Sequence, residues 1–226
     1  MTGPAIKGAH PLAHHPRRGL RDWLELIFKD HGFLRLFWHN LHEIRPGVWR
    51  SNQPAPADIR RAAQLGVKTI INLRGARSDG GWRLEKEACD AHGITLLDVT
   101  IRSRDVPNAD TIRKINELFQ SVQPPFLMHC KSGADRAGLM ATLYLLLVEK
   151  TSVDEALSML SLKYLHLKQA KTGLLDAFIE AYRPAESRGI SFLEWAETEL
   201  DPAAIKQKFT ARGWANRLID DVLRRE

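Results

Sequence analysis

One stretch of this chain combines residue types that can bind an oxyanion and attack it. It reads FLMHCKSGADRAG, from Phe126 to Gly138, with Cys130 and Arg136 at the two ends of a short polar loop. The apolar residues before the loop predict a buried strand, and the apolar run after it predicts a helix. Backbone N–H groups of such a loop gather at a helix N-terminus, so the sequence predicts an anion-binding site there.

Each side chain of the loop suits one part of that chemistry. The amides and the helix dipole would stabilise a thiolate at Cys130, which is then a good nucleophile. Arg136 offers a planar fork that can hold two oxygens at once. Gly133 allows a tight turn and a close approach of the ligand, and Lys131 adds positive charge at the rim. The alternative is that Cys130 is a buried core thiol and Arg136 a surface cation.

The spacing of His129, Cys130 and Arg136 resembles the signature of protein tyrosine phosphatases and dual-specificity phosphatases. Upstream, VWRSNQPAPADIRRAAQLGVKTIINLRG (48–75) is similar to the opening segment of bacterial tyrosine phosphatases and of their plant and fungal relatives. The resemblance covers residues 45–185. It implies that Cys130 forms a cysteinyl-phosphate that water hydrolyses, with no metal or cofactor. Further implied roles are loop ordering by His129, phosphate clamping by Arg136, and substrate binding by Lys131, Ser132, Gly133 and Ala134.

A proton donor for the leaving group is the next requirement, and three aspartates are candidates. The family uses an Asp on a mobile loop, and Asp105 fits because it follows the strand predicted at 94–99. Asp98 lies within that strand and is the second candidate. Asp135, directly before Arg136, is unusual for classical tyrosine phosphatases, although lipid phosphatases with a similar loop carry an acid there. The sequence leaves the three open.

Other positions are candidates for the walls of the site or depart from the family pattern. Gln169 occupies a place comparable to the glutamine that family members carry near the hydrolytic water. Arg74 ends a predicted strand, where open α/β sheets bind ligands. Ala137 stands where the family has Ser or Thr, so we expect slow breakdown of the phosphoenzyme unless Ser132 compensates. Further candidates for lining the pocket are His166, Lys168 and Lys171.

The bulk composition narrows the class of protein. The chain has 226 residues, of which 44% are hydrophobic and 27% charged, as in one compact domain with appendages. A net charge of +6 fits an anionic partner. Two cysteines give no disulfide framework and no Cys/His cluster has zinc-ligand spacing, so we expect a cytoplasmic protein. Cys89 is expected to be a plain buried cysteine; the alternative is a partner that protects oxidised Cys130.

Hydrophobic periodicity predicts alternating strands and helices after residue 46. Such alternation is typical of an α/β fold with a mainly parallel central sheet flanked by helices, and the family resemblance makes it dual-specificity phosphatase-like. The predicted strands are 48–50, 68–73, 94–99 and 126–129. The predicted helices are 58–65, 83–92, 112–119 (entered through Asn108 or Asp110), 137–149, 153–160 (capped by Ser152) and 174–182.

Four regions are expected along the chain. Residues 1–19 read as a disordered arm, and 20–44 as an amphipathic helical segment. Residues 45–185 form the phosphatase-like domain, and 186–226 a helical extension with a capping box of Ser191 and Glu194. The segment 20–41 is expected to pack on the domain's own core; the alternative is peripheral contact with an acidic membrane.

The function expected from these residues is hydrolysis of phosphotyrosine, with phosphoserine and phosphothreonine as further substrates. Because Asp135 and Lys131 share the loop, a phosphoinositide or other phospholipid phosphatase is the first alternative. A phosphate-binding module with weak turnover is the second, supported by Ala137. The expected partners are a phosphorylated protein or a phospholipid and no nucleic acid, and the oligomeric state stays open.

Overall fold

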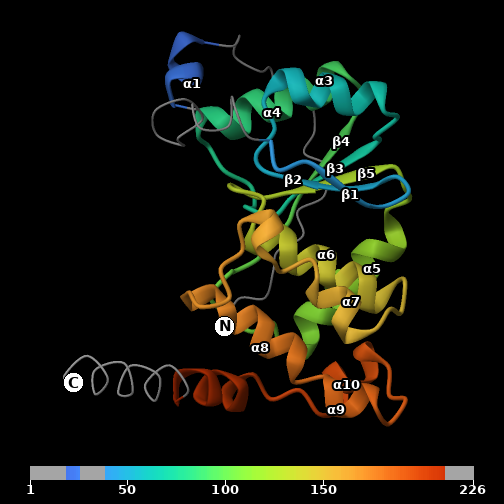
Figure 1. Cartoon of the computed structure of the whole chain (residues 1–226). Helices are drawn as coiled ribbons and strands as arrows, with labels where there is room; N and C mark the ends of the chain where they lie inside the picture. The colour runs from blue at the N-terminus through green and yellow to red at the C-terminus, as the bar shows by residue number, and fades with distance from the viewer. Residues whose placement is uncertain (1–18, 26–38, 212–226) are drawn as a thin grey trace, which may run out of the picture.

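The computed structural model describes residues 19–25 and 39–211 and contains a five-stranded sheet between two layers of helices (Figure 1). The strand order is β1-β2-β5-β3-β4. β1 (His42–Arg45) pairs antiparallel with β2 (Val48–Ser51), whereas β5 (Phe126–His129), β3 (Thr69–Asn72) and β4 (Thr95–Asp98) extend the sheet in parallel. The predicted mainly parallel sheet flanked by helices is confirmed.

The helices divide between the two faces of the sheet. α3 (Pro56–Gln64) and α4 (Gly80–Ala91) cover one face, with the short α1 (Leu20–Leu24) packed on α4, and α5 (Ala109–Ser121) and α6 (Asp135–Leu147) lie on the other face (Figure 1). Because the parallel strands all run the same way, their carboxyl ends meet at one edge of the sheet. The loop that begins at Cys130 leaves the central strand β5 at this edge.

Polar caps explain where several helices begin. Asn108 Oδ1 accepts from the amide of Thr111 at 2.9 Å, so Asn108 rather than Asp110 caps α5. Ser152 Oγ accepts from the amide of Glu155 at 3.3 Å and begins α7 (Val153–Leu157). Ser191 Oγ accepts from the amide of Glu194 at 3.2 Å and begins α10 (Phe192–Thr198). The predicted N-terminal caps at Ser152 and Ser191 are confirmed.

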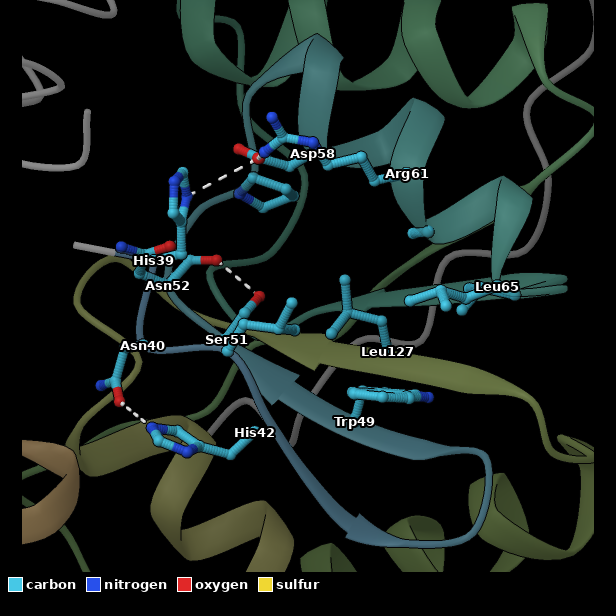
Figure 2. A pocket seen from close by; sticks show the side chains of 14 residues that line it. His39, Asn40, His42, Trp49, Ser51, Asn52, Asp58, Arg61, Leu65 and Leu127 are labelled. Carbon is cyan, nitrogen blue, oxygen red and sulfur yellow. Dashed lines mark hydrogen bonds and ion pairs between the residues drawn. The ribbon is translucent and has the colours of Figure 1, made fainter. Parts of the chain in front are cut away.

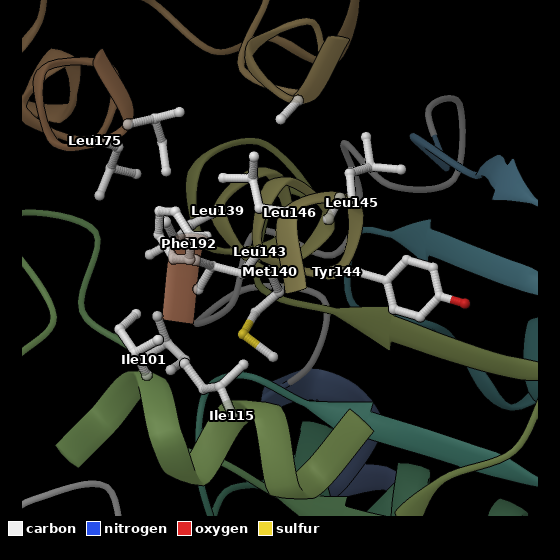
Figure 3. Close-up of a cluster of buried hydrophobic side chains, with 14 of the residues drawn as sticks. Ile101, Ile115, Leu139, Met140, Leu143, Tyr144, Leu145, Leu146, Leu175 and Phe192 are labelled. Atoms are coloured by element: carbon white, nitrogen blue, oxygen red, sulfur yellow. The ribbon is translucent and has the colours of Figure 1, made fainter. Parts of the chain in front are cut away.

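The core lies on both sides of β5, whose side chains alternate between the two faces. Phe126 and Met128 join the larger cluster with α5 and α6, while Leu127 joins a smaller cluster with Ile59 of α3 and Cys89 of α4. α6 is buried along almost its whole length because α5, the sheet and the C-terminal helices surround it (Figure 3). This central helix fixes the position of the catalytic-loop candidate that precedes it.

The N-terminal segment corrects one expectation. Within the region 20–44 that was predicted to be helical, residues 42–44 belong to the edge strand β1 instead. The described part of the segment packs on α4: Arg83 Nε donates to Asp22 Oδ1 at 3.0 Å, and Glu25 Oε2 accepts from the amide of Gly80 at 2.8 Å. The rest of the predicted arm and of the amphipathic segment (1–18 and 26–38) lies outside the described residues.

The C-terminal extension packs on the same core as the predicted domain. It follows α8 (Leu174–Glu180) and contains α9 (Arg183–Glu186), α10 and a helix that begins at residue 202. Phe192 and Trp195 of α10 contact Phe178 and Tyr182, with ring centroids 5.1–6.1 Å apart. Among the described residues, no helix is long and apolar enough to cross a bilayer.

Candidate functional site

The loop 130–134 joins the central strand β5 to the buried helix α6. Cys130 is 2% exposed, and the amide of Gly133 donates to its Sγ at 3.2 Å. Gly133 has φ +76°, and a Cβ there would lie 2.8 Å from Asn40 Nδ2 and from the backbone of Ser51 and Asn52. Only glycine allows the loop to turn this tightly against the neighbouring strand. The structure therefore places a cysteine sulfur inside a ring of backbone amides at a helix N-terminus.

Four consecutive backbone carbonyl groups of the loop accept hydrogen bonds from residues outside the loop. The carbonyl of Lys131 accepts from the amide of Gln53 at 3.3 Å, and that of Ser132 accepts from Asn40 Nδ2 at 3.0 Å. Arg50 Nη2 donates to the carbonyls of Gly133 at 2.6 Å and of Ala134 at 3.0 Å. Because C=O and N–H point opposite ways across a trans peptide, the amides of residues 132–135 turn toward the inside of the loop.

Arg50 supports the loop from a fully buried position on β2. Its side chain is 0% exposed, Nη1 donates to the carbonyl of Met159 at 2.7 Å, and its guanidinium lies 4.0 Å from the ring centroid of Tyr164. Desolvation lowers the pKa of Arg50 to about 10, so it remains cationic at neutral pH. The loop is thus held by a buried positive charge directly behind its carbonyl groups.

A second chain of polar side chains runs from His129 toward Arg74. His129 Nε2 lies 2.5 Å from Glu85 Oε1, and both side chains are fully buried. Gln53 Nε2 donates to the other oxygen of Glu85, and Arg74 Nη1 donates to Gln53 Oε1 at 2.8 Å. The predicted ligand-binding candidate Arg74 therefore has a hydrogen bond to Gln53 in this structure. His129 Nδ1 lies 3.5 Å from the carbonyl of Cys130, so this chain ends at the loop.

Asp135, the first residue of α6, has a partner that the sequence did not predict. His166 Nδ1 lies 2.8 Å from Asp135 Oδ1, and His166 Nε2 lies 2.7 Å from Asp176 Oδ2. His166 is 1% exposed, so it is a buried bridge between α6 and α8. Asp135 is therefore held by a bridge whose histidine is fully buried, whereas the Lys206 partner of Asp105 is 45% exposed. This difference argues against Asp135 as the proton donor.

The other two acid candidates differ in how firmly they are held. Asp98 accepts from Trp82 Nε1 at 3.1 Å and from Asn72 Nδ2 at 2.7 Å, and desolvation raises its pKa. Asp105 lies in the loop before α5 and is half-exposed; it accepts from the amide of Val106 at 2.9 Å and pairs with Lys206 of the C-terminal helix. Asp98 is built into the sheet edge, whereas Asp105 lies at the surface.

The remaining predicted positions are spread around the loop. Arg136 is half-buried, and its side chain makes no hydrogen bond or ion pair with the described residues, so its guanidinium is available to a ligand. Lys131 is half-buried and Ser132 exposed, whereas Ala134 is buried. Gln169, Lys168 and Lys171 are exposed around η3 (Lys171–Gly173). Ala137 is 0% exposed and has no hydroxyl to offer the site.

Three exposed leucines lie in a chain segment that adjoins the loop. Asn40 Nδ2 bonds the carbonyls of both Ser132 and Tyr164, so the segment around η2 (Leu162–Tyr164) adjoins the loop. The side chains of Leu162, Leu165 and Leu167 in this segment are 69%, 52% and 52% exposed. Exposed apolar side chains beside an anion site form a surface that the rest of a substrate can contact.

Cys89 lies on the other side of the sheet from the cluster that contains Cys130. It is 0% exposed on α4 within the smaller hydrophobic cluster, and desolvation raises the pKa of its thiol. A buried thiol of this kind stays protonated and packs as a small apolar group. This position supports the prediction of a plain core cysteine.

A cavity of about 400 Å³ lies beside the support of the loop (Figure 2). Asn40, Ser51 and Asn52 contribute to its wall, and Trp49 and Leu127 make it largely apolar. Neither Cys130 nor Arg136 is among the described residues that line it. Within the described chain, no group of three or more His, Cys, Asp or Glu side chains is arranged to hold a metal ion.

Comparison with known proteins gives matches that include this loop. Residues 39–174 match the family model described as "PTP-NADK: DSP-PTPase phosphatase fused to NAD+ Kinase". Dual specificity protein phosphatase TpbA of Pseudomonas aeruginosa is 26% identical over 119 residues, which are 52% of this chain and 51% of TpbA. Dual specificity protein phosphatase 26 of Rattus norvegicus is 23% identical over 154 residues, or 65% of this chain and 68% of the relative. The match thus spans about half the length of TpbA.

Solved structures show the same fold. The crystal structure of P. aeruginosa TpbA has a TM-score of 0.52 and 21% identity, and the match covers 66% of this chain and 91% of that one. A structure from Shewanella putrefaciens, described as "Putative phosphatase (DUF442)", has a TM-score of 0.53 and 16% identity, and the match covers 68% of this chain and 95% of that one. TpbA has also been solved in complex with pTyr, with a TM-score of 0.51 and 21% identity over 66% of this chain and 91% of that one.

Proposed function

The chain belongs to the family of DSP-PTPase phosphatases, and from this premise we propose that it hydrolyses phosphotyrosine through a cysteinyl-phosphate on Cys130. We propose phosphoserine and phosphothreonine as further substrates of the protein. The observation that carries it is the loop itself: four outward-held carbonyl groups turn successive amides inward, and one of those amides bonds the sulfur of Cys130. Amides arranged in advance stabilise an oxyanion without reorganisation cost.

In the first step of the proposed reaction, Cys130 Sγ attacks phosphorus. The S–P bond forms while the P–O bond to the tyrosine oxygen breaks, and the leaving oxygen takes a proton. Arg136 holds two non-bridging oxygens through its fork, and the loop amides hold the charge on the phosphoryl group. Asp105 is the proton donor of the proposal, because Asp135 is paired with His166 and Asp98 is fixed by Trp82 and Asn72.

In the second step, water attacks the phosphorus of the cysteinyl-phosphate. The S–P bond breaks, inorganic phosphate leaves, and Cys130 is restored. Asp105, having lost its proton, accepts one from the attacking water, and Gln169 is proposed to orient that water. Neither step takes up or releases electrons. The reaction keeps Cys130 reduced throughout, which fits the proposed cytoplasmic location.

The substrate is proposed to be a phosphorylated protein, supported by the pTyr complex of TpbA. The experiment compares wild type with Cys130→Ser, in buffer containing a chelator, on phosphotyrosine, phosphoserine and phosphothreonine peptides and on phosphoinositides. Release of phosphate from the peptides by wild type and none by Cys130→Ser is expected. Activity confined to phosphoinositides would replace the protein substrate with a lipid. Equal activity of the two proteins would rule out the cysteine mechanism.

A further inference from the structure

His166 is enclosed between two carboxylates of different helices. Nδ1 lies 2.8 Å from Asp135 Oδ1 on α6, and Nε2 lies 2.7 Å from Asp176 Oδ2 on α8. The side chain of His166 is 0% exposed, that of Asp176 4% and that of Asp135 28%. Of the three side chains, only that of Asp135 reaches the surface. Asp135 directly precedes Arg136 in the sequence.

The geometry defines the charge of this bridge. An ionised carboxylate only accepts hydrogen bonds, so between two ionised carboxylates both ring nitrogens donate and the ring is an imidazolium. Burial alone would lower the pKa of His166, but the hydrogen bonds to Asp135 and Asp176 outweigh it and raise the pKa to about 9. A further charged group that acts on Asp135 is Arg50 of β2, which supports the loop from behind.

An unpaired carboxylate at position 135 would oppose the ligand of the loop. Asp135 is the first residue of α6, so its backbone amide ends the ring of amides that faces the anion, and the same residue carries the carboxylate. Phosphate monoesters carry close to two negative charges at neutral pH. Like charges a few ångströms apart repel strongly when water is partly excluded.

We propose that His166 is a positioning residue that offsets the charge of Asp135, although the bridge with Asp176 keeps one net negative charge, and thereby allows a phosphate dianion to bind in the Cys130–Arg136 loop. Asp176 holds the ring in place and supports its second proton. The inference rests on the proposed function only in taking phosphate as the ligand of the loop. It also assigns Asp135 a role other than proton donor.

The test measures binding of inorganic phosphate by calorimetry, with every variant made in the full-length Cys130→Ser protein so that thiol ionisation does not contribute. His166→Gln keeps a polar side chain that can donate a hydrogen bond but removes the positive charge, and phosphate affinity should fall by about tenfold at pH 7. Adding Asp135→Asn to His166→Gln should restore most of that affinity, since the uncompensated charge is then gone. His92→Asn, at the exposed end of α4, is the matched control and should bind as its parent does.

A second comparison remains informative even where His166→Gln does not fold. Between pH 7.5 and 10, phosphate affinity should fall in the parent as His166 loses its proton and change much less in Asp135→Asn. A double variant that binds as weakly as His166→Gln would show a merely structural role and overturn the proposal. Equal pH dependence of the parent and Asp135→Asn would do the same. Because no turnover is measured, these outcomes are separate from those of the substrate panel.

Discussion

The guanidinium of Arg50 lies 2.6 Å from the carbonyl oxygen of Gly133, although 82 residues separate the two along the chain. The same Nη2 reaches the carbonyl of Ala134, and Nη1 reaches that of Met159. One buried cation therefore holds the catalytic-loop candidate and ties it to the segment after α7. The orientation of the loop amides depends on this residue as much as on the loop sequence.

Arg50→Lys tests that dependence. A lysine keeps the charge but has one nitrogen in place of Nη1 and Nη2, so it cannot reach the carbonyl of Met159 and those of the loop from the two arms of a fork. We expect kcat/KM on a phosphotyrosine peptide to fall by roughly 10²-fold, comparable to the loss of an oxyanion-hole donor. Arg183→Lys, at an exposed arginine that pairs with Glu180 and Asp154, is the control and should retain full activity. Equal activities of the two variants would contradict the role given to Arg50.

Gly133→Ala and Gly189→Ala form a matched pair, because both glycines have φ +76°. A Cβ on Gly189 meets nothing within 4 Å, whereas one on Gly133 meets Asn40, Ser51 and Asn52 at 2.8 Å. Gly189→Ala should cost only the backbone strain of about 1–2 kcal/mol and keep its activity. Gly133→Ala should lose activity and cost more free energy of unfolding, as measured by urea denaturation and phosphate release. Retained activity in Gly133→Ala would show that the loop tolerates a different shape.

Substrates with good and poor leaving groups distinguish the two remaining candidates for the proton donor, Asp105 and Asp98. A proton donor matters most for a poor leaving group, so Asp105→Asn should lower kcat/KM, which reports the first step, about 10²–10⁴-fold on phosphotyrosine or phosphoserine peptides. On p-nitrophenyl phosphate, whose leaving group needs little protonation, the loss should be much smaller. Asp98→Asn disturbs the contacts to Trp82 and Asn72 and should lower both activities alike. The reverse pattern would move the acid role to Asp98.

Much of the site could be predicted from the sequence because its parts are local. One strand, loop and helix start contain His129, Cys130, Gly133 and Arg136. The residues that cap α7 and α10 directly precede these helices in the sequence. The parts that were missed are contacts between distant segments. Asn40 reaches Ser132 across 92 residues and Gln53 reaches Glu85 across 32.

Such contacts leave no periodic pattern in the chain. Arg50 belongs to the segment 48–75 that resembles the family. Its burial behind the loop could not be predicted from that segment, because it depends on the pairing of β2 with β5. The same holds for His166, which was expected only as a wall of the pocket. Its bridge depends on α8 placing Asp176 on the other side of the ring. The interpretation of 20–44 as helical was wrong for residues 42–44, because pairing with β2 makes them part of an edge strand.

The charge on His166 also predicts how stability depends on pH. Its folded pKa of about 9 exceeds the ordinary value of 6.5, so its contribution is fully present below pH 6.5 and is lost as the pH rises through 9. The loss is at most about 3 kcal/mol. Urea midpoints of Cys130→Ser should therefore fall between pH 6.5 and 9.5, and the fall should be smaller when His166→Gln is added. Parallel curves for the two proteins would show that His166 is neutral in the folded state.

The most direct test of the account is to look for the phosphoenzyme itself. Wild type is mixed with a phosphotyrosine peptide, quenched in acid within milliseconds and digested for mass spectrometry. Because Ala137 offers no hydroxyl to the departing thiolate, the account predicts a burst of dephosphorylated peptide and one phosphoryl group on the peptide that contains Cys130. Substituting Ala137→Ser should speed the second phase and reduce that phosphopeptide. Steady turnover by wild type with no phosphoryl group on Cys130 at any time, under conditions that preserve a thiophosphate, would contradict the central claim.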